Sequence, residues 1–394
     1  MRYPLFAVII LLIFSGAIDY YIYRVVRKRC ANKRWGLAYG VTSIVLLCVL
    51  VTTIILPKRG GSNVALEWVI WLLFGYLSIY IPKILFLIFD LLAKIPTLLH
   101  HNRWRFVSYI GLGLGIVTFL LMWWGALFNR YNIDVVDEDV EIAQLPKSFD
   151  GFTIVQISDL HVGTFGTDDS FVKKFVNEIN GLHPDLIVFT GDIVNRKSEE
   201  LKPFTEAFSR LKAPYGVYSI LGNHDYGDYS SWNSEEEKRL DVENLCRMQE
   251  SMGWKMLNNS TAWIKKGNDS IALIGVENVG DPPFKTYGDL QKAYPTINDS
   301  KVKILLSHNP AHWVTDIENK TDMNVALTLS GHTHAMQMEL AGWSPAAWRY
   351  PTWGGMYADD SGHKLYVNIG AGEVGFPARI GATPEITLFT LKTE

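Results

Sequence analysis

The chain has 394 residues, of which 48% are hydrophobic, 13% aromatic and 20% charged, and its formal net charge is −3. The charge is unevenly distributed: residues 1–130 carry fourteen Lys or Arg against three Asp or Glu, a net charge of +11, so the rest carries −14. A basic, apolar front followed by an acidic, ordinarily patterned back excludes a single soluble globule, an intrinsically disordered chain and a collagen-like sequence. With only three cysteines, a disulfide-stapled miniature is excluded too.

The acidic second half also argues against nucleic acid as a partner. Binding to a phosphate backbone requires a basic patch, and no run of Lys and Arg occurs after residue 130. We therefore expect no nucleic-acid partner for this chain.

Four apolar stretches in the first 130 residues are each long enough to cross a membrane, which takes roughly 20 helical residues. They are Pro4–Tyr23, Trp35–Leu56, Trp68–Phe89 and Phe106–Phe128. The first is followed, not preceded, by a basic cluster, so we interpret it as a permanent span and not as a cleaved signal peptide. The sequence predicts a four-span transmembrane domain over residues 1–130 and a second domain over residues 131–394.

Positive charge predicts the orientation of the spans, because short loops rich in Lys and Arg stay in the cytoplasm. Residues 24–34 hold six Lys or Arg, and residues 94–105 hold three. The opposite side holds Arg2, Lys58, Arg59 and Arg130. We therefore expect both termini, and the domain that follows the spans, to be extracytoplasmic.

Asp19 and Lys83 lie inside the first and third spans. Charged side chains within a membrane are costly and are usually paired or functional. We interpret the two as a structural ion pair between helices; a transport or proton path is the alternative.

The second half consists of short apolar runs, rich in β-branched residues, that alternate with helical stretches such as Ser170–Leu182. This alternation predicts an α/β domain with crossover connections. Part of the roughly 22-residue linker after Phe128 is expected to form an additional edge strand. The predicted strands are Phe152–Ile157, Leu186–Thr190, Tyr215–Leu221, Ser270–Val276, Lys303–Leu306, Val325–Leu329, Lys364–Ile369 and Glu385–Leu391.

Five of these strands end in residues that bind metals. In chain order the ends are Asp-x-His at 159–161, Gly-Asp at 191–192, Gly-Asn-His-Asp at 222–225, His308, and Gly-His-Thr-His at 331–334. An open α/β sheet places its ligand crevice at the carboxyl ends of its strands. A single His at a strand end is usually structural, but five such ends in this order indicate a common site.

The ordered set resembles the calcineurin-like metallophosphoesterase superfamily, and the resemblance covers Phe152 to Leu391. It implies a sandwich of two β-sheets flanked by helices. The tail from Leu365 to Leu391, with the four preceding spans, further resembles a subgroup of membrane-associated or exported bacterial members. We therefore expect an integral protein of a bacterial cytoplasmic membrane.

The resemblance also implies a binuclear centre. Asp159, His161 and His334 would hold one metal, Asn223, His308 and His332 would hold the other, and Asp192 would bridge both. Carboxylate, imidazole and amide ligands suit Mn²⁺, Fe or Zn²⁺, of which we favour Mn²⁺. A hydroxide bridging the two metals would then attack phosphorus.

Two residues beside these ligands are candidates for catalysis. His224 has no metal in the family's scheme and is the candidate general acid. Asp225 is expected to orient or tune His224, with a turn-forming Asp as the alternative.

This sequence departs from the family where small glycines often follow the last motif, because it has Ala335-Met336-Gln337-Met338 there. A loop with Trp343, Trp348, Tyr350 and Trp353 comes next. Such aromatics favour a membrane interface. The alternative is a loop folded onto its own domain. We hypothesise a lipid-linked phosphate ester or pyrophosphate as substrate, presented at the bilayer.

The sequence predicts a membrane-anchored, metal-dependent phosphoric ester or pyrophosphate hydrolase. One alternative is a non-catalytic module that binds or senses a phosphorylated ligand; the intact ligand positions disfavour it. A transporter built around Asp19 and Lys83 is poorly served by four spans without an internal repeat.

Overall fold

The computed structural model describes residues 5–30, 32–55, 63–282, 284–295, 301–320 and 323–394. Pro4 and Leu56, at two of the predicted span ends, and the orienting charges Arg2, Lys58 and Arg59 lie outside these residues. The chain divides into two compact units, residues 1–126 and residues 127–394.

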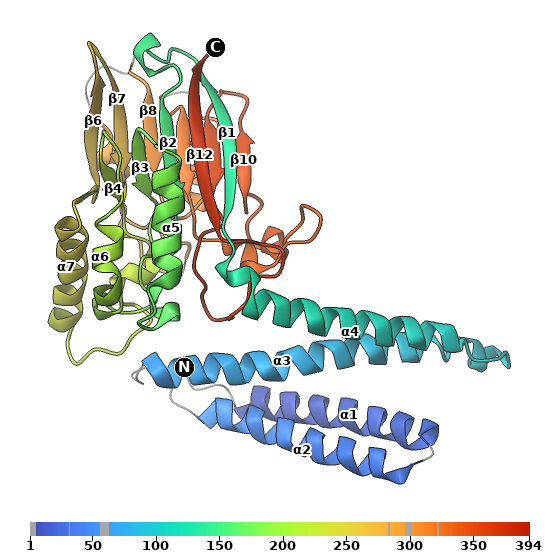
Figure 1. Ribbon diagram of the computed structural model, residues 1–394. Helices are drawn as coiled ribbons and strands as arrows, with labels where there is room; N and C mark the ends of the chain where they lie inside the picture. The colour runs from blue at the N-terminus through green and yellow to red at the C-terminus, as the bar shows by residue number, and fades with distance from the viewer. Residues whose placement is uncertain (1–4, 31, 56–62, 283, 296–300, 321–322) are drawn as a thin grey trace. The chain divides into compact units, whose positions relative to one another are not determined.

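The first unit is helical (Figure 1). Its four long helices are each apolar enough, by length and composition, to cross a membrane, which agrees with the four predicted spans. A short 3₁₀ helix, η1 (Ile95–Leu99), follows the third. The long helices are α1 (Leu5–Arg29), α2 (Lys33–Ile55), α3 (Asn63–Leu92) and α4 (Arg105–Leu127).

Asp19 is buried among α1, α2 and α3, where three donors surround its carboxylate. Lys83 Nζ lies 2.6 Å from Oδ1, Tyr39 donates to Oδ1 at 2.8 Å, and Tyr80 donates to Oδ2 at 2.5 Å. The predicted pair of Asp19 with Lys83 therefore forms. Because the donors come from two other helices, this carboxylate links three helices together.

Replacing Lys83 with Met should destabilise the first unit by about 3 kcal/mol, because it leaves the Asp19 charge buried without its cation. The double variant Asp19→Asn/Lys83→Met should recover part of the loss, since no lone charge remains. Thermal unfolding of the detergent-purified full-length chain, followed by size-exclusion, measures both. A double variant less stable than the single one would contradict the ion-pair interpretation.

The second unit contains two six-stranded mixed sheets. The first has the order β1-β12-β2-β3-β4-β5 and the second β10-β11-β9-β8-β7-β6. The strands of the first are β1 (Asp134–Ile142), β2 (Thr153–Ile157), β3 (Leu186–Phe189), β4 (Val217–Ser219), β5 (Trp254–Met256) and β12 (Glu385–Thr393). Those of the second are β6 (Ser260–Lys266), β7 (Asp269–Gly275), β8 (Lys303–Leu306), β9 (Leu327–Ser330), β10 (Gly355–Ala358) and β11 (Lys364–Val367).

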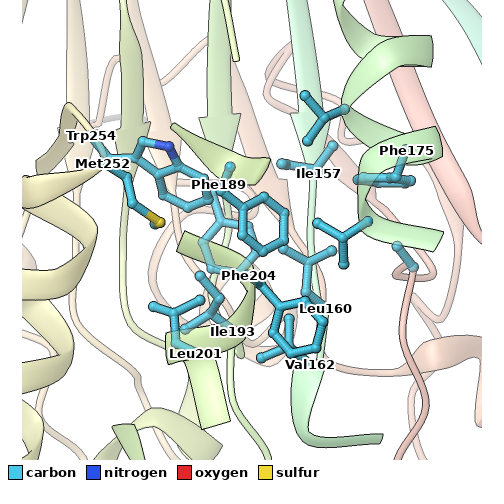
Figure 2. Packing of buried hydrophobic residues seen from close by; sticks show 14 of the residues in the cluster. Ile157, Leu160, Val162, Phe175, Phe189, Ile193, Leu201, Phe204, Met252 and Trp254 are labelled. Atoms are coloured by element: carbon cyan, nitrogen blue, oxygen red, sulfur yellow. The ribbon is translucent and has the colours of Figure 1, made fainter. Parts of the chain in front are cut away.

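Strand residues alternate between two cores, as the two-residue period of a strand requires. Val155 and Ile157 of β2 belong to a core shared with the helices on the outer face of the first sheet, whereas Ile154 belongs to the core between the sheets. In the outer core, shown in Figure 2, the rings of Phe189 and Trp254 lie 5.6 Å apart. Helices α5 (Ser170–Gly181), α6 (Thr205–Phe208) and α7 (Glu235–Ser251) cover this face (Figure 1).

A third core covers the other face of the second sheet. Trp313 of α9 (Ala311–Asp316) and Leu290 of α8 (Leu290–Ala293) pack there with Leu305 of β8. The unit is therefore a two-sheet sandwich flanked by helices, and the predicted fold class is confirmed. The central strands β3, β8 and β9 are buried on both faces, so the loops at their ends are supported by a rigid scaffold.

All eight predicted strands form, with ends that agree to within two residues. The predicted edge strand in the linker is β1, which pairs only with β12. The sequence did not reveal β5, β6 and β10. β5 has only three residues, and β6 and β10 are partly exposed, so none presents the continuous apolar run that marks a buried strand.

Candidate metal centre

The polar strand ends converge because their strands are neighbours. In the first sheet β2, β3 and β4 are adjacent and parallel, and in the second sheet β8 and β9 are adjacent and parallel. The segments after these five strands carry the predicted ligands Asp159, His161, Asp192, Asn223, His308, His332 and His334. The structure brings all seven together with His224.

Six of the ligand side chains form two groups, and Asp192 of the second group also faces the first. Asp159, His161 and His334 have atoms within 4.8 Å of one another, as do Asp192, His308 and His332. Asp192 Oδ2 lies 3.6 Å from His161 Nε2 and 3.1 Å from His308 Nε2, so it faces both groups. Asp192 therefore lies between the group that contains Asp159 and the group that contains His308.

Asn223 belongs to the second group. Its Oδ1 lies 2.8 Å from His332 Nδ1 and 3.1 Å from His308 Nε2. Asn223 Nδ2 donates to the Tyr229 hydroxyl at 3.0 Å, which turns the amide oxygen toward the centre.

Outer partners fix which nitrogen of each imidazole faces inward. His308 Nδ1 donates to the Thr190 carbonyl at 2.8 Å, and His332 Nε2 lies 2.9 Å from the Tyr350 hydroxyl. His308 Nε2 and His332 Nδ1 are thereby left facing the centre. Metal-binding histidines usually have such a partner on their second nitrogen.

The residues present fit divalent cations. Asp159 Oδ1 is buried, and no described residue gives it a well-aligned hydrogen bond, although His334 Nε2 lies 3.1 Å away. His161 Nε2 and His334 Nε2 also lie only 3.1 Å apart. A cation would satisfy the orphaned oxygen and both nitrogens together. Nitrogen and oxygen donors without a thiol suit Mn²⁺, Fe or Zn²⁺.

The electrostatics of the centre also favour bound cations. Burial opposes ionisation of Asp159, but the charges of His334 and His308 outweigh it and hold the pKa of Asp159 below its usual value. Burial likewise opposes the His308 imidazolium, yet Asp192 and Asp159 raise the pKa of His308 to about 9. Burial and the His308 charge lower the pKa of His332 to about 3. The buried carboxylates thus stay ionised and require positive charge beside them.

The backbone of the centre is held in an uncommon conformation. Five of the predicted ligands have left-handed φ values between 41° and 76°: Asp159, His161, Asp192, His332 and His334. Non-glycine residues adopt this region at a cost and cluster at functional sites when they do.

Two motif glycines are required by close approach. A Cβ on Gly222 would lie 2.3 Å from Asp192 Oδ1, and one on Gly331 would lie 2.2 Å from Asp159 Oδ2. The glycines that precede Asn223 and His332 therefore leave space for the two carboxylates.

His224 lies beside the ligands, and its orienting partner differs from the expectation. His224 Nδ1 donates to the Asn195 carbonyl at 2.8 Å, and its ring stacks on Tyr229 with centroids 4.2 Å apart. The Asp225 carboxylate instead accepts from the backbone N–H groups of Asp192, Ile193, Val194 and Gly222. Asp225 thus ties the loop after β3 to the loop after β4. His224 is oriented by the Asn195 carbonyl and not by Asp225.

Three supporting residues were not predicted as part of the centre. Asn195 acts through its backbone carbonyl, which any residue could supply. Tyr229 lies in the charged insertion after the Gly-Asn-His-Asp motif, and Tyr350 lies in the aromatic loop. Neither Tyr belongs to a short motif, since their contacts with Asn223 and His332 depend on how the two loops fold.

Both parts of the chain match known family profiles, and the chain is similar to several named proteins. Residues 1–130 match the profile of a calcineurin-like phosphoesterase transmembrane domain, and residues 152–336 match the calcineurin-like phosphoesterase profile. The chain is 30% identical to a transmembrane protein with metallophosphoesterase domain from Danio rerio over 83% of this chain and 74% of that protein. It is 33% identical to the metallophosphoesterase YkuE of Bacillus subtilis over 67% of this chain and 87% of that protein.

A third relative carries a printed activity. The chain is 32% identical to the UDP-2,3-diacylglucosamine pyrophosphatase LpxG of Chlamydia trachomatis, over 50% of this chain and 68% of that protein.

The full-length protein should bind two divalent cations per chain, and binding should raise its melting temperature. A cation at 100 times its Kd adds about 2.7 kcal/mol to the free energy of unfolding. Asp192→Asn should lower the metal content and the thermal shift together, because Asp192 faces both groups. Elemental analysis and thermal unfolding with Mn²⁺ or chelator measure this. Asp359→Asn is the matched control, since Asp359 pairs with His363 outside the centre; equal metal content in the two variants would refute the site.

Proposed function

The chain belongs to the calcineurin-like metallophosphoesterase family, and on that premise we propose that it is a membrane-anchored hydrolase of a phosphate ester or pyrophosphate with two divalent cations. One observation carries the proposal: the complete set of seven ligand side chains, with Asp192 facing both groups and His224 beside them. A module that only bound a phosphorylated ligand would have no need for the whole set.

When bound, the two cations supply Lewis acidity toward a phosphoryl group and activate water as a nucleophile. Asp159, His161 and His334 would hold one cation, Asn223, His308 and His332 the other, and Asp192 both. Mn²⁺ is our first choice of metal, with Fe and Zn²⁺ as alternatives.

Part of the centre is exposed to solvent. Among the seven ligands and His224, only Asn223, His224 and His332 are partly exposed. His224 has Nδ1 committed to Asn195, so Nε2 is free to exchange a proton with a substrate oxygen. This geometry supports His224 as the group that protonates the leaving oxygen.

We propose that the substrate is lipid-linked. The transmembrane domain holds the chain in the bilayer, where such a substrate resides. The LpxG relative is named for a pyrophosphate that carries a diacylated sugar, which combines a phosphoryl centre with an apolar part. Both observations favour an amphipathic phosphate ester or pyrophosphate over a small soluble one.

Detergent-purified full-length protein should hydrolyse at least one of an aryl phosphate monoester, an aryl phosphate diester and a lipid pyrophosphate in the presence of Mn²⁺, and chelator should abolish turnover. Asp192→Asn should be inactive. His224→Ala should lose about 10²–10⁴-fold in kcat, and less with a nitrophenolate leaving group, which needs no proton.

His363→Ala is the control for these variants, because His363 is a buried histidine bonded to Asp359 and the Met323 carbonyl. It should retain the wild-type rate. No turnover of any substrate by protein that demonstrably holds two metals would refute the hydrolase and favour a phospho-ligand-binding module.

We further propose that the chain resides in a bacterial cytoplasmic membrane and that residues 127–394 lie on its extracytoplasmic side. The support is the excess of Lys and Arg in residues 24–34 and 94–105.

Thiol labelling tests this orientation. Cys30 lies in the basic loop after α1 and is exposed, and Ser361 is exposed in the loop before β11. In intact cells an impermeant maleimide should label a Ser361→Cys variant that lacks the native cysteines, and should leave Cys30 unlabelled in a Cys48→Ala/Cys246→Ser variant until the membrane is permeabilised. The reverse pattern would place the domain in the cytoplasm.

A further inference from the structure

Four large apolar side chains on one short segment of the second unit are exposed to solvent. Met336 is 46% exposed, Leu340 79%, Trp343 46% and Trp348 82%. We call these four residues the apolar platform. In the described part of residues 127–394 the remaining exposed large hydrophobic residues are Leu127, Phe128 and Tyr131, at and just after the end of α4, and three isolated ones: Leu240, Phe284 and Val314.

The platform lies on the segment that follows the last ligand motif. It lies on η7 (His334–Gln337), η8 (Pro345–Trp348) and the turn between them, directly after the last ligand motif. Thr333 donates to the Trp353 carbonyl at 2.5 Å, and Ser344 donates to the Ala335 carbonyl at 2.5 Å. Tyr350, two residues after Trp348, contacts the partly exposed ligand His332. The segment is therefore bound to the motif on both sides of the platform.

The platform residues are held in place by defined local structure. The Trp343 and Trp348 rings meet edge to face at 5.4 Å. Met336 has a left-handed φ of 46°, a conformation that favours glycine, yet it holds an exposed apolar side chain there. Strain combined with exposure of an apolar group is typical of a functional surface.

The platform is also linked to the point where the chain enters this unit. Asn129, two residues after the end of α4, donates to the Arg379 carbonyl at 3.0 Å and accepts from Thr383. Ile380, in the same segment, pairs with both Gln337 and Glu339 through backbone hydrogen bonds of 2.8 Å. One segment, residues 379–383, therefore contacts both Asn129 and the segment that carries the platform.

We propose that the apolar platform inserts into the lipid surface of the membrane that holds α1–α4, and that it thereby seats the acyl chains of a lipid beside the metal centre. Tryptophan favours this interface, since its body is apolar and its N–H is polar. The proposed contact with lipid rests on the exposure of these four side chains and on their position after the last ligand motif. The delivery of a lipid-linked phosphate to His332 and His224 rests on the proposed function.

Depth-dependent quenching tests the contact without any turnover. In full-length protein without native cysteines, a bimane probe on Trp348→Cys should be quenched in vesicles whose lipids carry a nitroxide on an upper acyl carbon. A probe on Leu240→Cys, an exposed apolar position on α7 outside the platform, should not be quenched. Equal quenching at the two positions, or none at Trp348→Cys, would overturn the proposal.

A kinetic comparison tests delivery of the substrate. Trp343→Ser/Trp348→Ser should lower kcat/KM for a long-chain lipid phosphate in vesicles by about tenfold or more, because the interfacial contact is lost. A short-chain soluble phosphate with the same leaving group should be unaffected. Leu240→Ser/Val314→Ser, two exposed apolar residues on α7 and α9, is the matched control and should change neither rate.

The outcomes separate the two proposals. An equal loss on both substrates would overturn the platform and leave the hydrolase intact. Quenching at Trp348→Cys without turnover of either substrate would support the platform and count against the hydrolase.

Discussion

Two carboxylates, Asp159 and Asp192, are buried at the junction of the two sheets, and the organisation of the catalytic unit follows from keeping both ionised there. A buried carboxylate needs compensating charge or hydrogen bonds. The unit surrounds the pair with five imidazoles, and glycine at positions 222 and 331 leaves the carboxylates room. The Asp225 carboxylate, which accepts four backbone amides, fixes the loop that carries Asp192. The central strands of the two sheets are buried on both faces. Their ends are therefore rigid enough to maintain the left-handed backbone conformations of these ligands.

The same chain contains another buried carboxylate, whose charge is compensated by side chains alone. Asp19 of α1 is saturated by Lys83, Tyr39 and Tyr80, so it needs nothing further. Asp159 Oδ1, by contrast, has no well-aligned donor among the described residues. A saturated carboxylate stabilises helix packing, whereas an unsaturated one in a cluster of imidazoles marks a site for a cation. This contrast assigns Asp19 and Lys83 to structure and weakens the transporter interpretation.

The sequence predicted what depends on short spacing. Asp-x-His, Gly-Asn-His-Asp and Gly-His-Thr-His are local patterns, and a strand before each one places it at a sheet edge, so the ligand set and the fold class could be inferred together. Partners that approach through space could not. Asn195 contributes only a carbonyl, Tyr229 reaches Asn223 from an insertion, and β5 and β6 join the sheets as edge strands with little apolar signal. Asp225 was assigned to His224 because the two are adjacent in sequence, but its side chain turns toward the backbone of the preceding loop.

The division between motif and loop also explains why family membership does not fix the substrate. The fully buried ligands lie in the strand-end motifs, whereas the partly exposed Asn223 and His332 are each supported by a tyrosine from outside these motifs: Tyr229 from the insertion before α7 and Tyr350 from the segment beside the apolar platform. A substrate that approaches the centre meets these loops first. These two loops therefore border the exposed ligands, while the motifs hold the buried ones.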